Sequence, residues 1–267
     1  MARAIWKGPI SFGLVTIPVG LVPAQKSEVE VKFNQLDGRN NARIRYKRVN
    51  EITGEEVPTD EIVKAYPYSK DQFVVIAEEE LEQIRASASS SMEIEEFVDA
   101  SAITGLYYEK PYYAVPDPAA KRGYVVLRES LRRSGKVGIA RLVLRQKEYL
   151  AALMPLENAL MVMLLRFPEE VRLPSELDLP GQDLDAVKAT EREVELGLQL
   201  LEAMTAEWQP EKYRDRFREQ LLAAIEEKAR TGHISAPAKP SEEPFEGEPI
   251  DIMALLKKSL EKRAVSE

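Results

Sequence analysis

Apolar and polar residues alternate in several short stretches of the first half of the chain, a pattern typical of strands with one buried face. Ile10, Phe12 and Leu14 alternate with smaller or polar neighbours, and Pro18 limits the continuation, so one strand is predicted within residues 4–19. Further strands are predicted at residues 29–33, 43–49, 73–76 and 92–98. Turns are predicted at Asp37 with Gly38 and at Thr53 with Gly54.

The same β-rich texture continues in the middle of the chain. Residues 107–118 hold four tyrosines and three prolines, which favours an extended and partly packed segment. Three more strands follow, at residues 137–144, 149–154 and 160–165. Because these three form a meander, the chain is predicted to be of the α+β class, with an antiparallel β-barrel core.

Helical periodicity first becomes strong between the two groups of strands. In residues 121–133, Tyr124, Leu127 and Leu131 recur at helical spacing, and Gly135 supplies the end of the helix. A shorter helix is predicted at residues 78–85, where the acidic opening suits the positive end of a helix dipole.

The last third of the chain is predicted to be helical. Helices are expected at residues 183–208 and from Pro210 to about residue 230, followed by a proline-rich flexible linker and a short final helix capped by Asp251. The expected parts are a barrel core with a bridging segment at 1–180, a helical part of the core at 181–230, a linker at 231–249 and a partner-binding helix at 250–267.

The composition excludes several kinds of chemistry. The chain has no cysteine and one histidine, His233, so disulfides, thiolate zinc sites and Cys- or His-based nucleophilic catalysis are poorly supported. No glycine-rich phosphate loop is present. We therefore expect a non-enzymatic protein that needs neither a metal ion nor a cofactor.

Two catalytic readings stay open. Glu93 and Glu95 share a face of a predicted strand and could serve acid–base chemistry or hold Mg²⁺, although chance pairing is common in an acidic protein. A buried lysine with a lowered pKa could form a Schiff base.

Charge is distributed unevenly along the chain. The net charge is -8, which by itself argues against nucleic acid as a ligand. Residues 1–150, however, hold 22 Lys and Arg against 21 Asp and Glu, so the acidity lies in the second half. Two basic windows, residues 39–48 and 110–147, could each form a positive surface, or be ordinary solvated faces.

Four blocks of sequence carry a resemblance to a known family. They are AIWKG at 4–8 with ISFGLV at 10–15, RIRYK at 43–47 with TGEEV at 53–57, EEFVD at 95–99 through YYEKPYY at 107–113, and GKVGIA at 135–140 through KEYL at 147–150. In this order the blocks resemble the bacterial Ku family, over roughly residues 1–230.

The resemblance implies a fold and a function. Members of this family are homodimers in which extended segments bridge two β-barrels into a ring, and duplex DNA threads through the ring. Such a ring admits DNA only at an end, so Lys and Arg can touch phosphates without reading sequence. Two-fold symmetry would present each basic window twice. The implied role is nonhomologous end joining of double-strand breaks, with recruitment of a multidomain ATP-dependent DNA ligase.

Thirteen basic residues are candidate phosphate contacts. They are Arg43, Arg45, Lys47, Arg48, Lys64, Lys70, Lys121, Arg122, Arg128, Arg132, Arg133, Lys136 and Arg141. For Arg141 the alternative is a buried ion pair on its strand face, and Lys7 and Lys110 could also be structural. Candidate ligase-binding residues in the final helix are Ile252, Met253, Leu256 and Leu260, although this helix could instead fold back on its own core.

Two other functions compete with DNA-end binding. One is lyase chemistry at abasic sites with a lysine nucleophile, and the other is a protein-only dimeric scaffold whose basic windows are ordinary surface. No stretch approaches the roughly 20 uninterrupted apolar residues of a membrane-spanning helix. We therefore expect a cytoplasmic protein associated with the nucleoid, and no membrane partner.

Overall fold

The computed structural model describes residues 3–26, 31–70, 72–86, 91–145, 147–232 and 252–264. The chain divides into two compact units, Met1–Leu173 and Pro174–Glu267. We call them the barrel unit and the helical unit. Within the barrel unit, residues 31–86 are called the arm.

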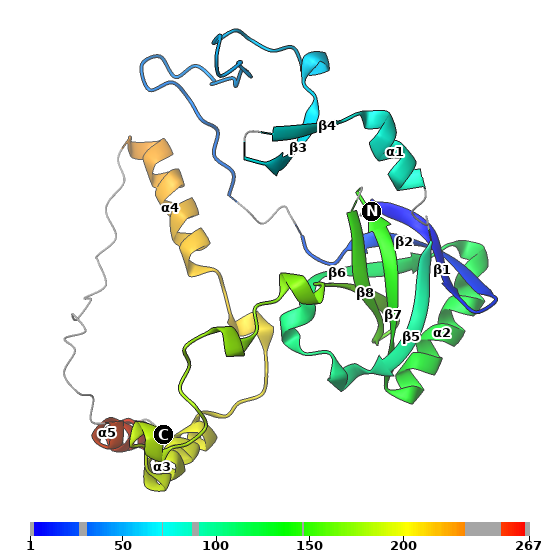
Figure 1. Ribbon diagram of the computed structural model, residues 1–267. Coiled ribbons are helices and arrows are strands. Elements are labelled where there is room, and N and C mark those ends of the chain that lie inside the picture. Colours follow the sequence, from blue (N-terminus) through cyan, green and yellow to red (C-terminus); the bar gives the residue numbers. More distant parts are fainter. Residues whose placement is uncertain are drawn as a thin grey trace. The chain divides into compact units, whose positions relative to one another are not determined.

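A closed barrel of seven strands forms the core of the barrel unit (Figure 1). The strands are β1 (Trp6–Phe12), β2 (Val15–Pro23), β5 (Met92–Asp99), β6 (Tyr108–Pro116), β7 (Lys136–Leu144), β8 (Lys147–Leu156) and β9 (Ala159–Leu165). They pair in the order β1, β2, β6, β9, β8, β7, β5. All neighbours are antiparallel except β1 and β5, whose short parallel pairing closes the barrel. The predicted α+β barrel fold is thereby confirmed.

The first strand predicted from the sequence is confirmed as β1, with Ile10 buried, but the predicted range holds a hairpin of two strands and not one strand. Gly13 takes a positive φ of 54° and reverses the chain, so β1 and β2 pair with Ile10 opposite Ile17. Pro18 does not end the strand; it lies inside β2, opposite Pro9 of β1. Pro18 lacks an N–H, but its carbonyl still accepts a hydrogen bond from the Asp117 N–H at 3.0 Å.

The helix α2 (Lys121–Ser134) packs against β2, β7 and β8, as its amphipathic pattern predicts. Tyr124, Leu127 and Leu131 are buried, and Gly135 ends the helix with a left-handed φ of 66°. The Tyr124 hydroxyl donates to the Ala114 carbonyl at 2.9 Å and accepts from the Leu160 N–H at 2.6 Å, which ties the helix to β6 and β9.

The arm has little regular structure. It contains β3 (Lys64–Ser69) and β4 (Gln72–Ile76), which form a separate two-stranded sheet, and α1 (Glu78–Ala86). The predicted turns at 37–38 and 53–54, the strand at 73–76 and the helix at 78–85 are confirmed.

Two strands predicted in or near the arm are wrong. Residues 43–49 form only two isolated bridges, Leu36 with Arg43 and Val49 with Glu56, because no neighbouring strand continues the pairing. Residues 31–33 are not in a strand either, and residues 29 and 30 lie outside the described part of the chain.

The helical unit contains α3 (Glu191–Met204), α4 (Arg216–Thr231) and α5 (Ile252–Ala264). Both predicted helices before the linker begin later than expected. Thr190 caps α3 in a capping box with Glu193, whereas Asp185–Val187 is a separate 3-10 turn. Asp215 caps α4, whereas Pro210–Lys212 is another 3-10 turn.

The prediction of a final helix is confirmed by α5, which packs against α3. Its predicted cap and most of the predicted linker, residues 233–251, lie outside the described residues. The other 3-10 turns are Thr59–Glu61, Ala100–Ala102, Gly105–Tyr107, Pro118–Ala120, Pro168–Glu170 and Pro174–Glu176. Among the described residues, no helix is both long and apolar enough to cross a bilayer.

Candidate nucleic-acid interface

The thirteen candidate residues lie on two structures. Arg43, Arg45, Lys47, Arg48, Lys64 and Lys70 are in the arm, and Lys121, Arg122, Arg128, Arg132, Arg133, Lys136 and Arg141 are on α2 and β7. All are exposed except Arg128 and Lys136, which are half-buried. What separates them is whether an acidic side chain already neutralises each cation.

The loop before β3 is held in shape by local polar contacts. The Asp37 carboxylate accepts from both the backbone N–H and the guanidinium of Arg39, and these hydrogen bonds hold the pKa of Asp37 below its usual value. The Asn50 side chain accepts from the backbone N–H groups of Ile52 and Thr53. These turns fix the ends of the basic stretch between them.

Three arginines of this loop are available to a ligand. Arg43, Arg45 and Arg48 are exposed and form no ion pair with any described residue. Lys47, between them, is paired with Glu56 at 2.5 Å. Guanidinium groups without a carboxylate partner suit phosphate oxygens, which they bind with parallel hydrogen bonds.

The β3–β4 hairpin carries the other two arm candidates. Lys64 Nζ lies 2.7 Å from a Glu78 carboxylate oxygen, and both side chains remain about half exposed. Lys70, at the turn of the hairpin, is exposed and makes no ion pair within the described chain. The hairpin therefore offers one neutralised and one available cation.

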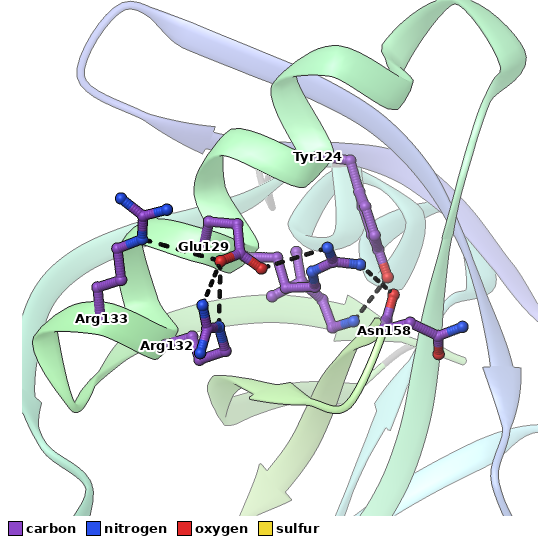
Figure 2. A network of polar contacts seen from close by, with 7 residues as sticks. Tyr124, Glu129, Arg132, Arg133 and Asn158 are labelled. Carbon is purple, nitrogen blue, oxygen red and sulfur yellow. Dashed lines mark hydrogen bonds and ion pairs between the residues drawn. The ribbon is translucent and has the colours of Figure 1, made fainter.

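Glu129 contacts three of the four arginines of α2 (Figure 2). Its carboxylate accepts from Arg132 at 2.7 Å, from Arg128 at 3.3 Å, and lies 3.9 Å from the Arg133 guanidinium. The hydrogen bond from Arg132, followed by its charge and by the contact with Arg128, lowers the pKa of Glu129. Because three arginines surround one carboxylate, this cluster keeps a net positive charge that can attract a second anion.

Arg128 has a structural role in addition. Its Nη1 donates to the Asn158 carbonyl at 2.6 Å, across the turn between β8 and β9, and its side chain is only 17% exposed. Burial also raises the pKa of the neighbouring Tyr124 phenol. Arg128 is therefore the candidate least able to reach a phosphate.

The cations at the start of α2 have no ion pair within the described chain, whereas the cation at the start of β7 has one. Lys121 and Arg122 open α2, where no acidic residue lies in the first turn, and neither forms an ion pair with a described residue. Their charges oppose the positive end of the helix dipole, so an anionic ligand there is stabilising. Lys136, by contrast, lies 2.8 Å from the Asp99 carboxylate.

Arg141 has the ion pair that the sequence left open as an alternative. Its Nε donates to Glu95 at 2.7 Å and its Nη1 lies 3.4 Å from Glu148, and both carboxylates raise the pKa of the guanidinium. The contact is half exposed and not buried. Glu95, one of the two carboxylates considered for Mg²⁺, is thus engaged by Arg141. Within the described residues, no cluster of three metal-ligating side chains was found.

Arg145 is an available cation that the candidate set left out. Arg145 lies at the β7–β8 turn with a positive φ of 51°, is exposed and makes no ion pair with the described residues. It lies inside the second basic window, so the charge pattern contains it. Its neighbour Lys147 differs, because it donates to Glu170 at 2.9 Å and lies over the Tyr149 ring.

The candidate partner-binding residues of α5 divide into two groups. Met253 and Leu256 are half-buried on a helix that packs against α3, while Ile252 is 54% exposed. The side chain of Leu260 lies outside the described part. Leu255, which was not a candidate, is also 54% exposed. The open apolar surface of α5 is therefore formed by Ile252 and Leu255.

Comparison with known proteins gives a consistent result over nearly the whole chain. Residues 11–196 match the family model described as the Ku70/Ku80 beta-barrel domain. A protein named "Non-homologous end joining protein Ku" from Coxiella burnetii is 46% identical over 98% of this chain and 95% of its own length. Proteins of the same name from Cupriavidus necator and Pseudomonas aeruginosa are 42% and 41% identical, covering 98% and 99% of this chain and 79% and 90% of their own lengths.

Proposed function

This chain belongs to the Ku family, and from that premise we propose that it binds double-stranded DNA ends, independently of sequence, as a homodimeric ring. In this role it would hold the ends of a double-strand break for nonhomologous end joining. The observation that carries the proposal is the arm, which combines available arginines with a lack of any core of its own.

The exposed apolar side chains of the arm are the evidence for a dimer. None of its described residues is buried, and Tyr66, Tyr68 and Phe73 of the hairpin are 63%, 73% and 68% exposed. A two-stranded hairpin without a covering layer is marginal in water. In a two-fold symmetric dimer, the arm of each chain can cover the exposed apolar side chains of the other.

The arm and α2 support the DNA ligand through their unpaired cations. Arg43, Arg45, Arg48, Lys121 and Arg122 have no carboxylate to neutralise them among the described residues, and a dimer would present each twice. Contacts to phosphates carry no sequence information, so preference for ends would come from threading of the duplex through a closed ring.

The exposed side chains of α5 are the evidence for recruitment of a ligase. Ile252 and Leu255 remain exposed on it, and Lys257 and Lys258 follow on its next turn. An exposed apolar pair beside two cations suits docking into an apolar groove with an acidic rim. We propose a multidomain ATP-dependent DNA ligase as the partner, and a cytoplasmic, nucleoid-associated location for the complex.

The proposed role is binding and not catalysis, and no cofactor is proposed. Lyase chemistry at abasic sites would need a lysine amine that acts as the nucleophile. Borohydride reduction in the presence of abasic DNA tests this alternative. A covalent protein–DNA adduct would favour the lyase.

The decisive experiment compares a short linear duplex with a covalently closed circle of the same sequence, at several salt concentrations, with the mass of the protein measured in solution. We expect a dimer that binds only the linear duplex. If about 6 to 10 phosphates are contacted, affinity should fall by roughly 10³ to 10⁵ between about 50 and 200 mM salt. Equal binding to the circle would remove the ring, and binding to neither would favour a protein-only scaffold.

A further inference from the structure

A groove lies beside α2 and is lined mainly by apolar side chains that belong to none of the polar contacts above. Its cavity has a volume of about 690 Å³ and is lined by Phe12 of β1, Val15 of β2 and Phe97 of β5 on one side, and by Val126 and Leu127 of α2 on the other. We call it the α2 groove; in Figure 1, α2 lies on the β1 and β5 side of the barrel. This volume is typical of pockets that enclose a large part of a ligand.

The α2 groove is apolar and open to solvent. Val126 is 59% exposed, Phe97 45% and Val15 42%, and Leu14, at the turn next to Val15, is fully exposed. By contrast, Leu127 and Leu131 bury themselves against the barrel and already anchor the helix. A cluster of exposed apolar side chains around a cavity marks an interaction site, since leaving it in water costs solvation free energy.

The charge at the α2 groove is positive. Its polar lining consists of the hydroxyls Ser130 and Ser134 and the cations Arg122 and Lys136, and no acidic side chain among the described residues lines it. Lys136 forms an ion pair with Asp99, whereas Arg122 has no ion pair within the described chain. A ligand that carries carboxylates is therefore favoured over one that carries ammonium groups.

We propose that the α2 groove docks a short acidic peptide segment of another protein. One large apolar side chain of the segment enters between Phe97 and Val126, and a carboxylate next to it pairs with Arg122. A sugar–phosphate backbone fits less well, because it has no large apolar group to fill the cavity. This docking site goes beyond DNA-end binding, although it shares Arg122 with the proposed phosphate contacts.

The test uses the full chain and takes advantage of its lack of cysteine. In the variant Val126→Cys the only thiol lies in the α2 groove, and its alkylation by N-ethylmaleimide is timed with and without peptide. The probes are three blocked peptides, Gly-Ser-Asp-Glu-X-Glu-Asp-Ser-Gly, in which X is Phe, Leu or Trp. At saturation, at least one should slow alkylation about tenfold, in line with a pocket that buries most of its ligand.

Val125→Cys is the matched control. Val125 directly precedes Val126 in α2, is 43% exposed and lines a separate cavity with Tyr113 and Asn158. The alkylation rate of a cysteine at this position should therefore not change with peptide. Adding Arg122→Gln to Val126→Cys should raise the half-protecting peptide concentration about tenfold, because a charge-assisted hydrogen bond is lost. A peptide with Lys in place of Asp and Glu should give no protection.

Three results would overturn the proposal. The first is no protection of Val126→Cys by any of the peptides up to about 1 mM, a weak affinity for a specific site. The second is equal protection by the Lys peptide or at Val125→Cys. The third is slow alkylation of Val126→Cys without peptide that becomes faster on dilution, which would show that a second copy of the chain covers the groove.

Discussion

The barrel and the arm hold their apolar side chains in opposite ways. In the barrel, Ile10, Leu21 and Leu153 are completely buried, whereas Tyr66 and Phe73 in the arm are more than 60% exposed. Burial of a large apolar side chain stabilises a fold by roughly 1.5 to 3 kcal/mol. The barrel thus contains its own source of stability, while the described residues of the arm bury too little apolar surface to be stabilised in this way.

The same two regions also differ in their charges. On the barrel, Arg141 and Lys136 are held by carboxylates, and Arg128 is used to fix a turn. In the arm loop, Arg43 and Arg45 have no such partner in the described chain. The difference is one of degree, because Lys47 and Lys64 of the arm are also paired, whereas Arg122 beside the barrel is not paired with any described residue.

The largest effect is expected from reversing the free charges of the arm. The triple variant Arg43→Glu, Arg45→Glu and Arg48→Glu removes up to six phosphate contacts from a dimer. We expect DNA affinity at moderate salt to fall by at least about 10³, and the slope of log affinity against log salt to shrink by up to about 5. Titration of a labelled linear duplex at several salt concentrations measures both quantities.

A control triple variant keeps the same change in net charge. Reversing Arg192, Lys212 and Lys228 of the helical unit, which are exposed and not among the candidates, should lower affinity far less. If both triple variants weaken binding equally, the arm has no special role and only the overall charge matters.

The second effect separates the sources of stability of the two regions. Leu153→Ala leaves a cavity in the barrel and should cost about 3 kcal/mol, or roughly 6 to 12 °C in the unfolding midpoint for a unit of this size. Phe73→Ala in the arm should leave that midpoint nearly unchanged at low protein concentration, but should shift the monomer–dimer equilibrium toward monomer. Scanning calorimetry and sedimentation at several concentrations measure the two effects, and a large loss of barrel stability in Phe73→Ala would refute the contrast.

The third effect distinguishes two arginines of the same helix. Arg128→Gln removes the hydrogen bond to the Asn158 carbonyl and should cost about 1 to 2 kcal/mol of stability, with little change in the salt dependence of DNA binding. Arg122→Gln should leave stability unchanged and reduce the salt slope by roughly 1 to 2 for a dimer. The reverse assignment of the two outcomes would show that Arg128 is the phosphate contact.

The smallest effect is the pH dependence of the Glu129 cluster. The arginines around it hold the pKa of Glu129 below its ordinary value of 4.5, so the folded state binds this proton less tightly than the unfolded state. The resulting stabilisation is present above that value and is lost as the pH falls through the folded pKa. Unfolding midpoints of the natural chain and Glu129→Gln should differ slightly at pH 7 and converge in acid; a difference that grows in acid would contradict the assignment.

Local signals in the sequence were sufficient for most of the barrel unit. The three strands of the meander and α2 follow from alternation and helical spacing, and Gly135 marks the helix end because glycine tolerates a left-handed φ. Residues 43–49 show the limit of such signals. They have the composition of a strand but no neighbour to pair with, and a strand exists only when its backbone groups are shared with another.

The candidate site was predictable as a set of residues but not as a set of functions. The charge windows contain the arm arginines, the bases of α2 and Arg145, yet nothing local distinguishes Arg122 from Arg128. The distinction comes from Asn158, thirty residues further along the chain, whose carbonyl the turn between β8 and β9 brings to Arg128.

The sequence by itself determined the class of the fold, the positions of most strands and helices, the absence of thiol chemistry and, through its four blocks, the family. The tertiary structure decided where the chain reverses between β1 and β2, that β1 and β5 close the barrel in parallel, and which cations remain free. Arg141 meets Glu95 across forty-six positions of sequence, and Lys136 meets Asp99 across thirty-seven. Such pairs depend on the register between strands, which is set by the packing of the whole barrel and not by any local pattern.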